Sequence, residues 1–269
     1  MGPLLSSMPL SRTRCCSLVL AAAVLGCDSP PVEWQSDTIV PAGGAGVTLT
    51  ANGRVDAAAS AAPMAVQGAG VACRASTRYA RAGSTVYAVW WAPRADSMAY
   101  LMSSRSADGG VTWSTPAAVD TTDHGPSGCN RPAASIAADS ASGYVHVAYG
   151  LVGAEGPGIF FAHSMDQGRT FHTPVPILYG EHLGLTSVSA SGDNVAVAFE
   201  DPNSTAPRIG LALSHTMGHI FENRVVPVSD DHGSAVEPLV AVGGSSIAVA
   251  WRERGSKDAS LRVRVGRLR

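Results

Sequence analysis

The sequence predicts an all-β fold made of four repeated antiparallel sheets, because four apolar segments of similar pattern recur along the chain. Their first residues lie 59, 50 and 52 positions apart. Each segment is rich in β-branched and aromatic residues and is bounded by Gly, Ser, Asn or Asp, as is typical of a buried strand between turns. No sustained 3.6-residue apolar period follows the N-terminal region, so helix should be a minor component. The four segments are Val86–Trp90, Val145–Tyr149, Val195–Phe199 and Ile247–Trp251.

A second apolar strand is expected in each repeat, after the apolar segment named above. These strands lie around Tyr100 and at Ile159–Ala162, Ile209–Leu213 and Leu261–Val265. A repeat of this length has room for a four-stranded antiparallel sheet, and repeated sheets of this kind close most simply around a common axis.

A turn motif recurs after these strands, in register with the repeats. The two good copies comprise Ser106, Asp108, Gly110, Thr112 and Trp113, and Ser164, Asp166, Gly168, Thr170 and Phe171, and a worn copy has Ser214, Thr216, Gly218 and Phe221. The motif resembles the Asp-box of the bacterial neuraminidase repeat, which occurs in sialidases and other β-propellers. The carboxylate of such a motif caps backbone amides, its glycine takes a positive φ and its aromatic ring packs between sheets. Asp108 and Asp166 are therefore expected to be structural and not catalytic.

The resemblance implies a β-propeller of four recognisable blades within residues 34–269. The fourth repeat stops after its third strand, whereas Trp34–Pro41 resembles the fourth-strand segments of other repeats. We therefore expect this N-terminal segment to close the last blade and leave no open edge. Residues 42–70 contain a predicted hairpin around Asn52-Gly53, which is either an insert or part of a fifth blade. Sialidases have six blades, so the chain is too short for a complete one.

The N-terminus is predicted to be a secretory signal. Residues 1–14 carry two arginines and no acid, and a short apolar run leads to Val24-Leu25-Gly26-Cys27. This ending resembles the lipobox of bacterial lipoproteins, which implies removal of residues 1–26 and lipidation of Cys27. Residues 27–33 would then be a tether, and the protein would be anchored to a membrane of the cell envelope, facing the periplasm or the exterior. A formal net charge of −2 argues against a nucleic-acid partner.

The resemblance to sialidases also raises the question of whether the chain has the catalytic groups of that family. Sialidases grip a carboxylate with three arginines and use a Tyr nucleophile with a Glu partner and an Asp acid. Arg74 lies where the innermost strand of the first blade is expected, and Arg131 lies in the equivalent place of the next repeat. The third and fourth repeats offer Thr186 and Pro238, and no Tyr–Glu pair stands at a recognisable spacing. We assign no catalytic residue and expect Arg74 and Arg131 to form salt bridges or bind an anion.

Three acid–histidine pairs follow the predicted fourth strands: Asp123-His124, Glu181-His182 and Asp231-His232. If they converge at one mouth of the channel, imidazoles beside carboxylates would suit Zn²⁺ or Cu²⁺. The alternative is simple turn chemistry, with no cofactor. The other histidines are expected on strands or outer turns without convergent partners; they are His146, His163, His172, His215 and His219.

Cys73 and Cys129 are the two thiols that remain if residues 1–26 are removed and Cys27 is lipidated. Both precede predicted innermost strands of adjacent blades, and an exported protein reaches a compartment where disulfides persist. We predict a disulfide, with two buried free thiols as the alternative.

The function expected from these features is a non-catalytic propeller that binds a glycan or an envelope protein at its channel mouth. One alternative is an exo-α-sialidase-type hydrolase, either degenerate or completed by oligomerisation. The second alternative is a metal-binding propeller using the histidine loops.

Overall fold

The structure is a computed structural model that describes residues 2, 29–41, 46–57, 73–230, 234–254 and 260–269. Pro31–Arg269 form one compact unit. The predicted signal and Cys27 lie outside the described residues. No helix in the described ranges is long and apolar enough to cross a membrane.

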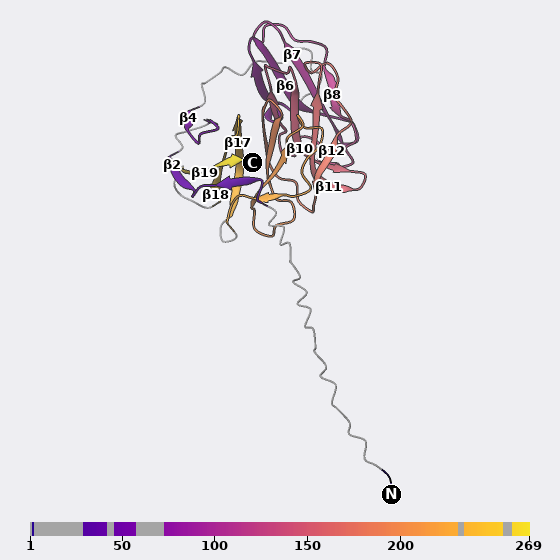
Figure 1. Cartoon of the computed structure of the whole chain (residues 1–269). Helices are drawn as coiled ribbons and strands as arrows, with labels where there is room; N and C mark the ends of the chain where they lie inside the picture. Colours follow the sequence, from indigo (N-terminus) through magenta and orange to yellow (C-terminus); the bar gives the residue numbers. More distant parts are fainter. Residues whose placement is uncertain (1, 3–28, 42–45, 58–72, 231–233, 255–259) are drawn as a thin grey trace. The chain divides into compact units, whose positions relative to one another are not determined.

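The prediction of an all-β propeller is confirmed, because the described strands form four antiparallel sheets and one hairpin (Figure 1). The four apolar segments that recur in the sequence lie in the second strand of each sheet. Blade 1 comprises β5 (Arg78–Ala82), β6 (Thr85–Pro93), β7 (Ala99–Ser106) and β8 (Ala117–Asp120). Blade 2 comprises β9 (Ser135–Ala138), β10 (Val145–Gly153), β11 (Gly156–Ser164) and β12 (Val175–Tyr179). Blade 3 comprises β13 (Thr186–Ser191), β14 (Asn194–Glu200), β15 (Ile209–Ser214) and β16 (Val226–Pro227). Blade 4 comprises β17 (Ala235–Gly243), β18 (Ser246–Glu253) and β19 (Ser260–Leu268), closed by β1 (Val32–Trp34) and β2 (Thr38–Pro41).

The N-terminal segment completes blade 4, as predicted. β1 pairs with the end of β19, where Val32 lies opposite Leu268, and β2 pairs with its beginning, where Thr38 lies opposite Val263. In Figure 1 the indigo β2 lies beside the yellow β19. These two short strands cover an edge that would otherwise expose unpaired backbone groups.

The predicted hairpin around Asn52-Gly53 is also present. It consists of β3 (Val47–Leu49) and β4 (Val55–Ala57), and Gly53 has a φ of +83° in its turn. Apolar side chains of the hairpin pack against blade 4 residues that include Leu261 and Val263. Within residues 46–57 this unit contributes two strands, which cover part of blade 4.

The core lies between the faces of neighbouring blades, because the central strands are buried on both faces. Trp91 of blade 1 meets Tyr149 of blade 2 edge to face, with ring centroids 6.0 Å apart. Phe161 of blade 2 meets Phe221, in the turn between β15 and β16 of blade 3, in the same way, at 4.8 Å. Each large apolar side chain buried here contributes about 1.5–3 kcal/mol.

The first strands of the blades run side by side in the same direction. The backbone N–H groups of Val240 and Val242 in β17 donate to the hydroxyls of Ser187 and Ser189 in β13, at 3.1 and 3.0 Å. The third strands run parallel to the first strands, so they end on the opposite face of the propeller from the one where the first strands begin. The face where the third strands end carries the turns Ser106–Trp113, Ser164–Phe171 and Ser214–Phe221, and we call it the turn face. The face where the first strands begin is called the mouth face.

Candidate functional site

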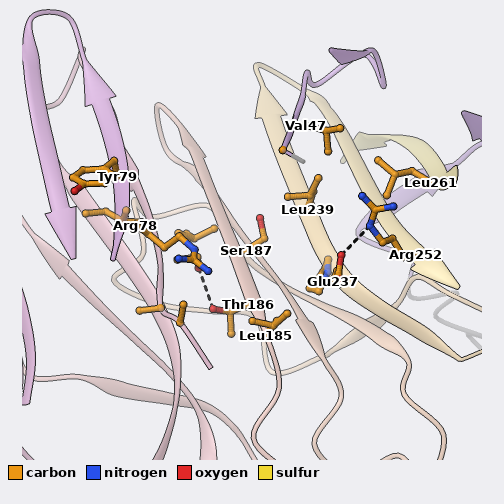
Figure 2. A pocket seen from close by; sticks show the side chains of 17 residues that line it. Val47, Arg78, Tyr79, Leu185, Thr186, Ser187, Glu237, Leu239, Arg252 and Leu261 are labelled. Atoms are coloured by element: carbon orange, nitrogen blue, oxygen red, sulfur yellow. Dashed lines mark hydrogen bonds and ion pairs between the residues drawn. The ribbon is translucent and has the colours of Figure 1, made fainter. Parts of the chain in front are cut away.

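A pocket of about 570 Å³ lies where the first strands of all four blades begin. This volume falls within the usual range for a small-molecule site. Figure 2 shows side chains from β5, β13 and β17 around the opening. The lining residues are Gly46, Val47, Arg78, Tyr79, Ala133, Ala134, Ser135, Ile136, Leu185, Thr186, Ser187, Val188, Glu237, Pro238, Leu239, Arg252 and Leu261.

Arg78 and Tyr79 form one side of the pocket (Figure 2). Nη1 of Arg78 donates to the carbonyl oxygens of Ala75 and Thr77, at 3.0 and 2.9 Å. These bonds tie the guanidinium to the loop before β5 and orient it. Burial raises the pKa of the Tyr79 hydroxyl, so this phenol is neutral and can donate a hydrogen bond.

Glu237 and Arg252 form the opposite side, joined by an ion pair of 2.8 Å between Arg252 Nε and Glu237 Oε2 (Figure 2). Glu237 lies at an irregularity in the pairing of β17 with β18 and has a φ of +55°. Its backbone N–H donates to Glu200 Oε1 at 3.0 Å, and Glu200 Oε2 accepts the N–H of Leu185 at 3.2 Å. Glu200 therefore holds Glu237 in place from blade 3.

Hydroxyl groups and an apolar wall complete the pocket. Ser135 and Thr186 lie 3.0 Å apart between their hydroxyl oxygens, and both hydroxyls donate to the carbonyl of Ala148. Leu185 and Leu239 supply apolar surface. Charged groups on opposing sides with hydroxyl and apolar groups between them suit a polar ligand that has both hydroxyls and apolar ring faces.

The two arginines singled out from the sequence lie apart from this lining. Arg74 is exposed in a short 3₁₀ turn, Arg74–Ser76, so the expectation that it lies on the innermost strand was wrong: β5 begins four residues later. The turn forms because Ser76 bonds both Cys73 O and the N–H of Trp91.

Arg131 is buried and fully engaged. Its Nη1 lies 2.8 Å from Asp123 Oδ2, with the two side chains 3% and 1% exposed. Its other nitrogens donate to the carbonyls of Gly128 and Gly125, and its guanidinium stacks 5.0 Å from the ring of Trp91. Arg131 therefore braces the loop between blades 1 and 2.

The disulfide predicted between Cys73 and Cys129 is present, with the Cα atoms 5.3 Å apart. It ties the turn before β5 to the loop before β9 and so joins blades 1 and 2 beside the pocket.

The histidine loops do not assemble a metal site from the described residues. Among those residues no group of three or more His, Cys, Asp or Glu side chains could hold a metal ion. The carboxylate of Asp123 accepts from Arg131 and from the backbone of Ala99 and Gly125. His124, Glu181 and His182 are exposed, whereas Asp231 and His232 lie outside the described residues.

Four of the other histidines do converge, contrary to expectation. His163 lies 4.6 Å from both His172 and His219, measured between ring centroids, and Tyr144 lies 6.1 Å from His146 and from His163. Burial, with the neighbouring imidazoles, lowers the pKa values of His146 and His163 to about 4. We call these four residues, His146, His163, His172 and His219, the histidine cluster. His146 and His163 are cross-strand partners in β10 and β11, and His172 follows β11 in the same blade. His219 comes from the turn between β15 and β16 of blade 3, which packs against blade 2.

The recurring turns have the structural role expected of them. Asp166 accepts hydrogen bonds from Ser164 Oγ, from both the N–H and Oγ1 of Thr170, and from the N–H of Arg169. Partial burial raises the pKa of this carboxyl, but the hydrogen bonds outweigh it and lower the pKa to about 2. Asp108 makes the corresponding bonds in blade 1, which lower its pKa as well.

The pocket residues Arg78, Tyr79, Arg252 and Glu237 were not singled out from the sequence. The available signal was their position: each lies at the mouth end of a strand near the axis, where side chains from different blades approach one another. The alternation of apolar and polar residues does not predict that position, because the turn at Arg74 delays the start of β5 and the pairing of β17 is irregular at Glu237.

No protein-family model and no curated protein matches the chain. Among solved structures, it is similar to a Trypanosoma rangeli sialidase with a TM-score of 0.50 and 13% identity, over 71% of this chain and 35% of that one. A variant of NanB sialidase from Streptococcus pneumoniae aligns with a TM-score of 0.46 and 12% identity, over 71% and 30% of the two chains. A GH43_1 enzyme from Xanthomonas citri aligns with a TM-score of 0.44 and 12% identity, over 70% and 66%.

The chain spans less than half the length of the sialidases it resembles. At such identities the likeness concerns the fold alone. The chain therefore has a sialidase-like β-propeller fold.

Proposed function

We propose that this protein is an envelope-anchored lipoprotein whose propeller binds an acidic glycan in the axial pocket without cleaving it. The observation that carries the proposal is the pairing of Arg78 on one side of the pocket with the strained Glu237 on the other. A guanidinium binds a carboxylate or sulfate, and a carboxylate accepts hydrogen bonds from sugar hydroxyls. The lining holds two arginines and one acid, which favours a ligand of negative charge.

The absence of cleavage is inferred from the lining residues. Glycosidases of the two-carboxylate type need a pair of acids flanking the bond, about 5–9.5 Å apart. Among the described lining residues Glu237 is the one carboxylate, and Tyr79 lies across the pocket from it (Figure 2). A sialidase-type Tyr–Glu nucleophile pair is therefore not formed by these two groups.

The anchor rests on the sequence ending Leu25-Gly26-Cys27. Lipid chains contribute about 0.8 kcal/mol per buried methylene, so a diacylated Cys27 would hold the protein on a membrane. Replacing Cys27 by Ser should release the protein from the membrane fraction or block its processing. Unchanged size and unchanged membrane partition would contradict the anchor.

The glycan proposal is tested by screening residues 28–269 on an array of acidic and neutral glycans, followed by calorimetry on the best ligand. Arg78→Gln and Glu237→Gln should each weaken binding at least tenfold. Arg74→Gln, which removes a nearby exposed arginine outside the lining, is the matched control and should bind like the parent. Binding that is unaffected by both pocket variants, or release of a free sugar, would contradict the proposal.

A further inference from the structure

The three recurring turns lie on the turn face, where hydrogen bonds hold parts of them to nearby strands and turns. Arg105 Nη1 at the end of β7 donates to Gln167 Oε1 at 3.1 Å, which joins blade 1 to the turn of blade 2. The N–H of Met217 donates to Asp193 O within blade 3, and Asn194 Nδ2 donates to Gly244 O, which joins blades 3 and 4. These contacts fix the positions of the turns of blades 2 and 3.

Each of the three turns presents one large exposed apolar side chain. Val111 is 71% exposed, Met165 45% and Ile220 70%. The hydrogen bonds of each turn hold the backbone that carries these side chains. Blades 1, 2 and 3 therefore each present one exposed apolar side chain on the same face, and this repetition indicates a contact surface.

The chain also reaches the folded domain at this face. Val32 pairs with Leu268 at the end of β19, and the N–H of Arg269 donates to Pro31 O at 3.1 Å. Cys27 lies five residues before Val32, a reach of at most about 16–18 Å for an extended chain. A domain of this size has a radius of gyration of about 18 Å, so the tether is shorter than the domain is wide.

The charges of the turn face are mixed. Exposed Arg169 and Arg267 accompany Asp108 and Asp193 on it. A face of mixed charge does not favour anionic over neutral lipid. Binding of this face to a bilayer would therefore rest on apolar contact and on the short tether. A tether raises the effective concentration of a weak contact site at its surface.

We propose that the turn face docks on a lipid bilayer through Val111, Met165 and Ile220, which points the pocket away from the membrane. This proposal rests on the lipid anchor of the proposed function. Its consequence is that an acidic glycan reaches the pocket from the side facing away from the bilayer.

The test uses residues 27–269, in which Cys27 is the one cysteine besides the bonded pair Cys73 and Cys129. Cys27 is coupled to a maleimide lipid in phosphatidylcholine vesicles, and backbone amide exchange is compared with that of the uncoupled protein mixed with the same vesicles. Protection should appear in the three turns and not in the mouth-face loops Arg94–Met98 and Gly153–Gly156. It should persist at high salt.

A triple variant, Val111→Ser, Met165→Ser and Ile220→Ser, should lose this protection while keeping the parent Tm. The matched control replaces two exposed tyrosines of the mouth face, Tyr100→Ser and Tyr179→Ser, and should keep the protection. Protection of the mouth-face loops, or of no loop, would overturn the docking. The vesicle experiment attaches Cys27 to lipid chemically, so its result does not depend on lipidation in cells. If Cys27 is not lipidated in cells, the anchor proposal is contradicted, whereas the docking of the turn face is still tested by the vesicle experiment.

Discussion

Glu237 has a backbone conformation that is costly for a non-glycine residue. Its φ is +55° and it directly precedes Pro238, a position that further restricts the backbone. Such conformations cost about 1–3 kcal/mol and persist only where the surroundings hold them. Here Glu200 accepts the Glu237 N–H and Arg252 pairs with the Glu237 side chain. The strain positions a carboxylate in the pocket, which is the reason to regard it as functional.

Glu237→Gly should therefore separate stability from binding. Glycine accepts a positive φ without a Cβ clash, and the ion pair lost is partly exposed and worth about 0–1 kcal/mol. We expect a stability equal to or above that of the parent, by about 1 kcal/mol, together with loss of glycan binding. Urea denaturation and calorimetry measure the two quantities. A variant that loses stability by several kcal/mol would show that Glu237 is structural.

Arg131 illustrates the opposite case, a buried arginine with a purely structural role. Removing one partner of a buried ion pair leaves the other charge unpaired, at a cost of about 3–5 kcal/mol. Arg131→Ala should lower the free energy of unfolding by this amount because Asp123 stays buried. Arg74→Ala, the exposed counterpart, should change it by less than about 0.5 kcal/mol. Equal effects in urea denaturation would contradict this assignment.

At the scale of elements, the strands were predictable because each central strand is a run of β-branched and aromatic residues between turn residues. Val145–Tyr149 is an example, and it lies within β10 as expected. The disulfide was predictable because Cys73 and Cys129 precede the first strands of adjacent blades. The pocket was not predictable, because its lining depends on a 3₁₀ turn that delays β5 and on the irregularity at Glu237.

The histidine cluster was missed although His146 and His163 are cross-strand partners in β10 and β11. His172 follows β11 in the same blade, and the stacking of blade 3 on blade 2 adds His219. His146 and His163 have buried ring nitrogens without hydrogen-bond partners among the described residues. His172 and Tyr144 stack on His163, and His219 meets it edge to face. Uncharged imidazoles are tolerated here, whereas protonated ones would repel one another.

The cluster should make the fold sensitive to acid. The pKa values of His146 and His163 are about 4 in the folded chain and about 6.5 in the unfolded chain, so the folded state binds fewer protons. Stability should be complete above pH about 6.5 and should fall as pH drops towards 4, by up to about 1.4 kcal/mol per pH unit for each histidine. Asp139, which faces His146 and raises its pKa, moderates the effect.

Urea denaturation at pH 7, 6, 5 and 4.5 measures this dependence. His163→Phe should flatten the profile, because an uncharged ring then occupies the site. His124→Phe, at an exposed loop position, is the matched control and should leave the profile unchanged. A parent profile that is flat from pH 7 to 4.5 would contradict the role of the cluster.

At the scale of the whole molecule, closure of blade 4 by the N-terminal strands joins the two ends of the domain. Deleting residues 28–42 would uncover the edge of β19 and remove the packing of Trp34 and Val32 against blade 4. We expect aggregation or a fall in Tm of many degrees. Deleting only residues 28–30 is the control and should leave Tm unchanged. A 28–42 deletion that melts like the parent would show that the segment is a linker.

Binding of an acidic glycan in the axial pocket is the proposal on which the function depends. A crystal structure of residues 28–269 with the best ligand from the array would show the bound position. We expect the sugar to lie among the starts of β5, β9, β13 and β17, with its anionic group on Arg78 and a hydroxyl on Glu237. A sugar bound elsewhere on the propeller, with the pocket empty, would contradict it.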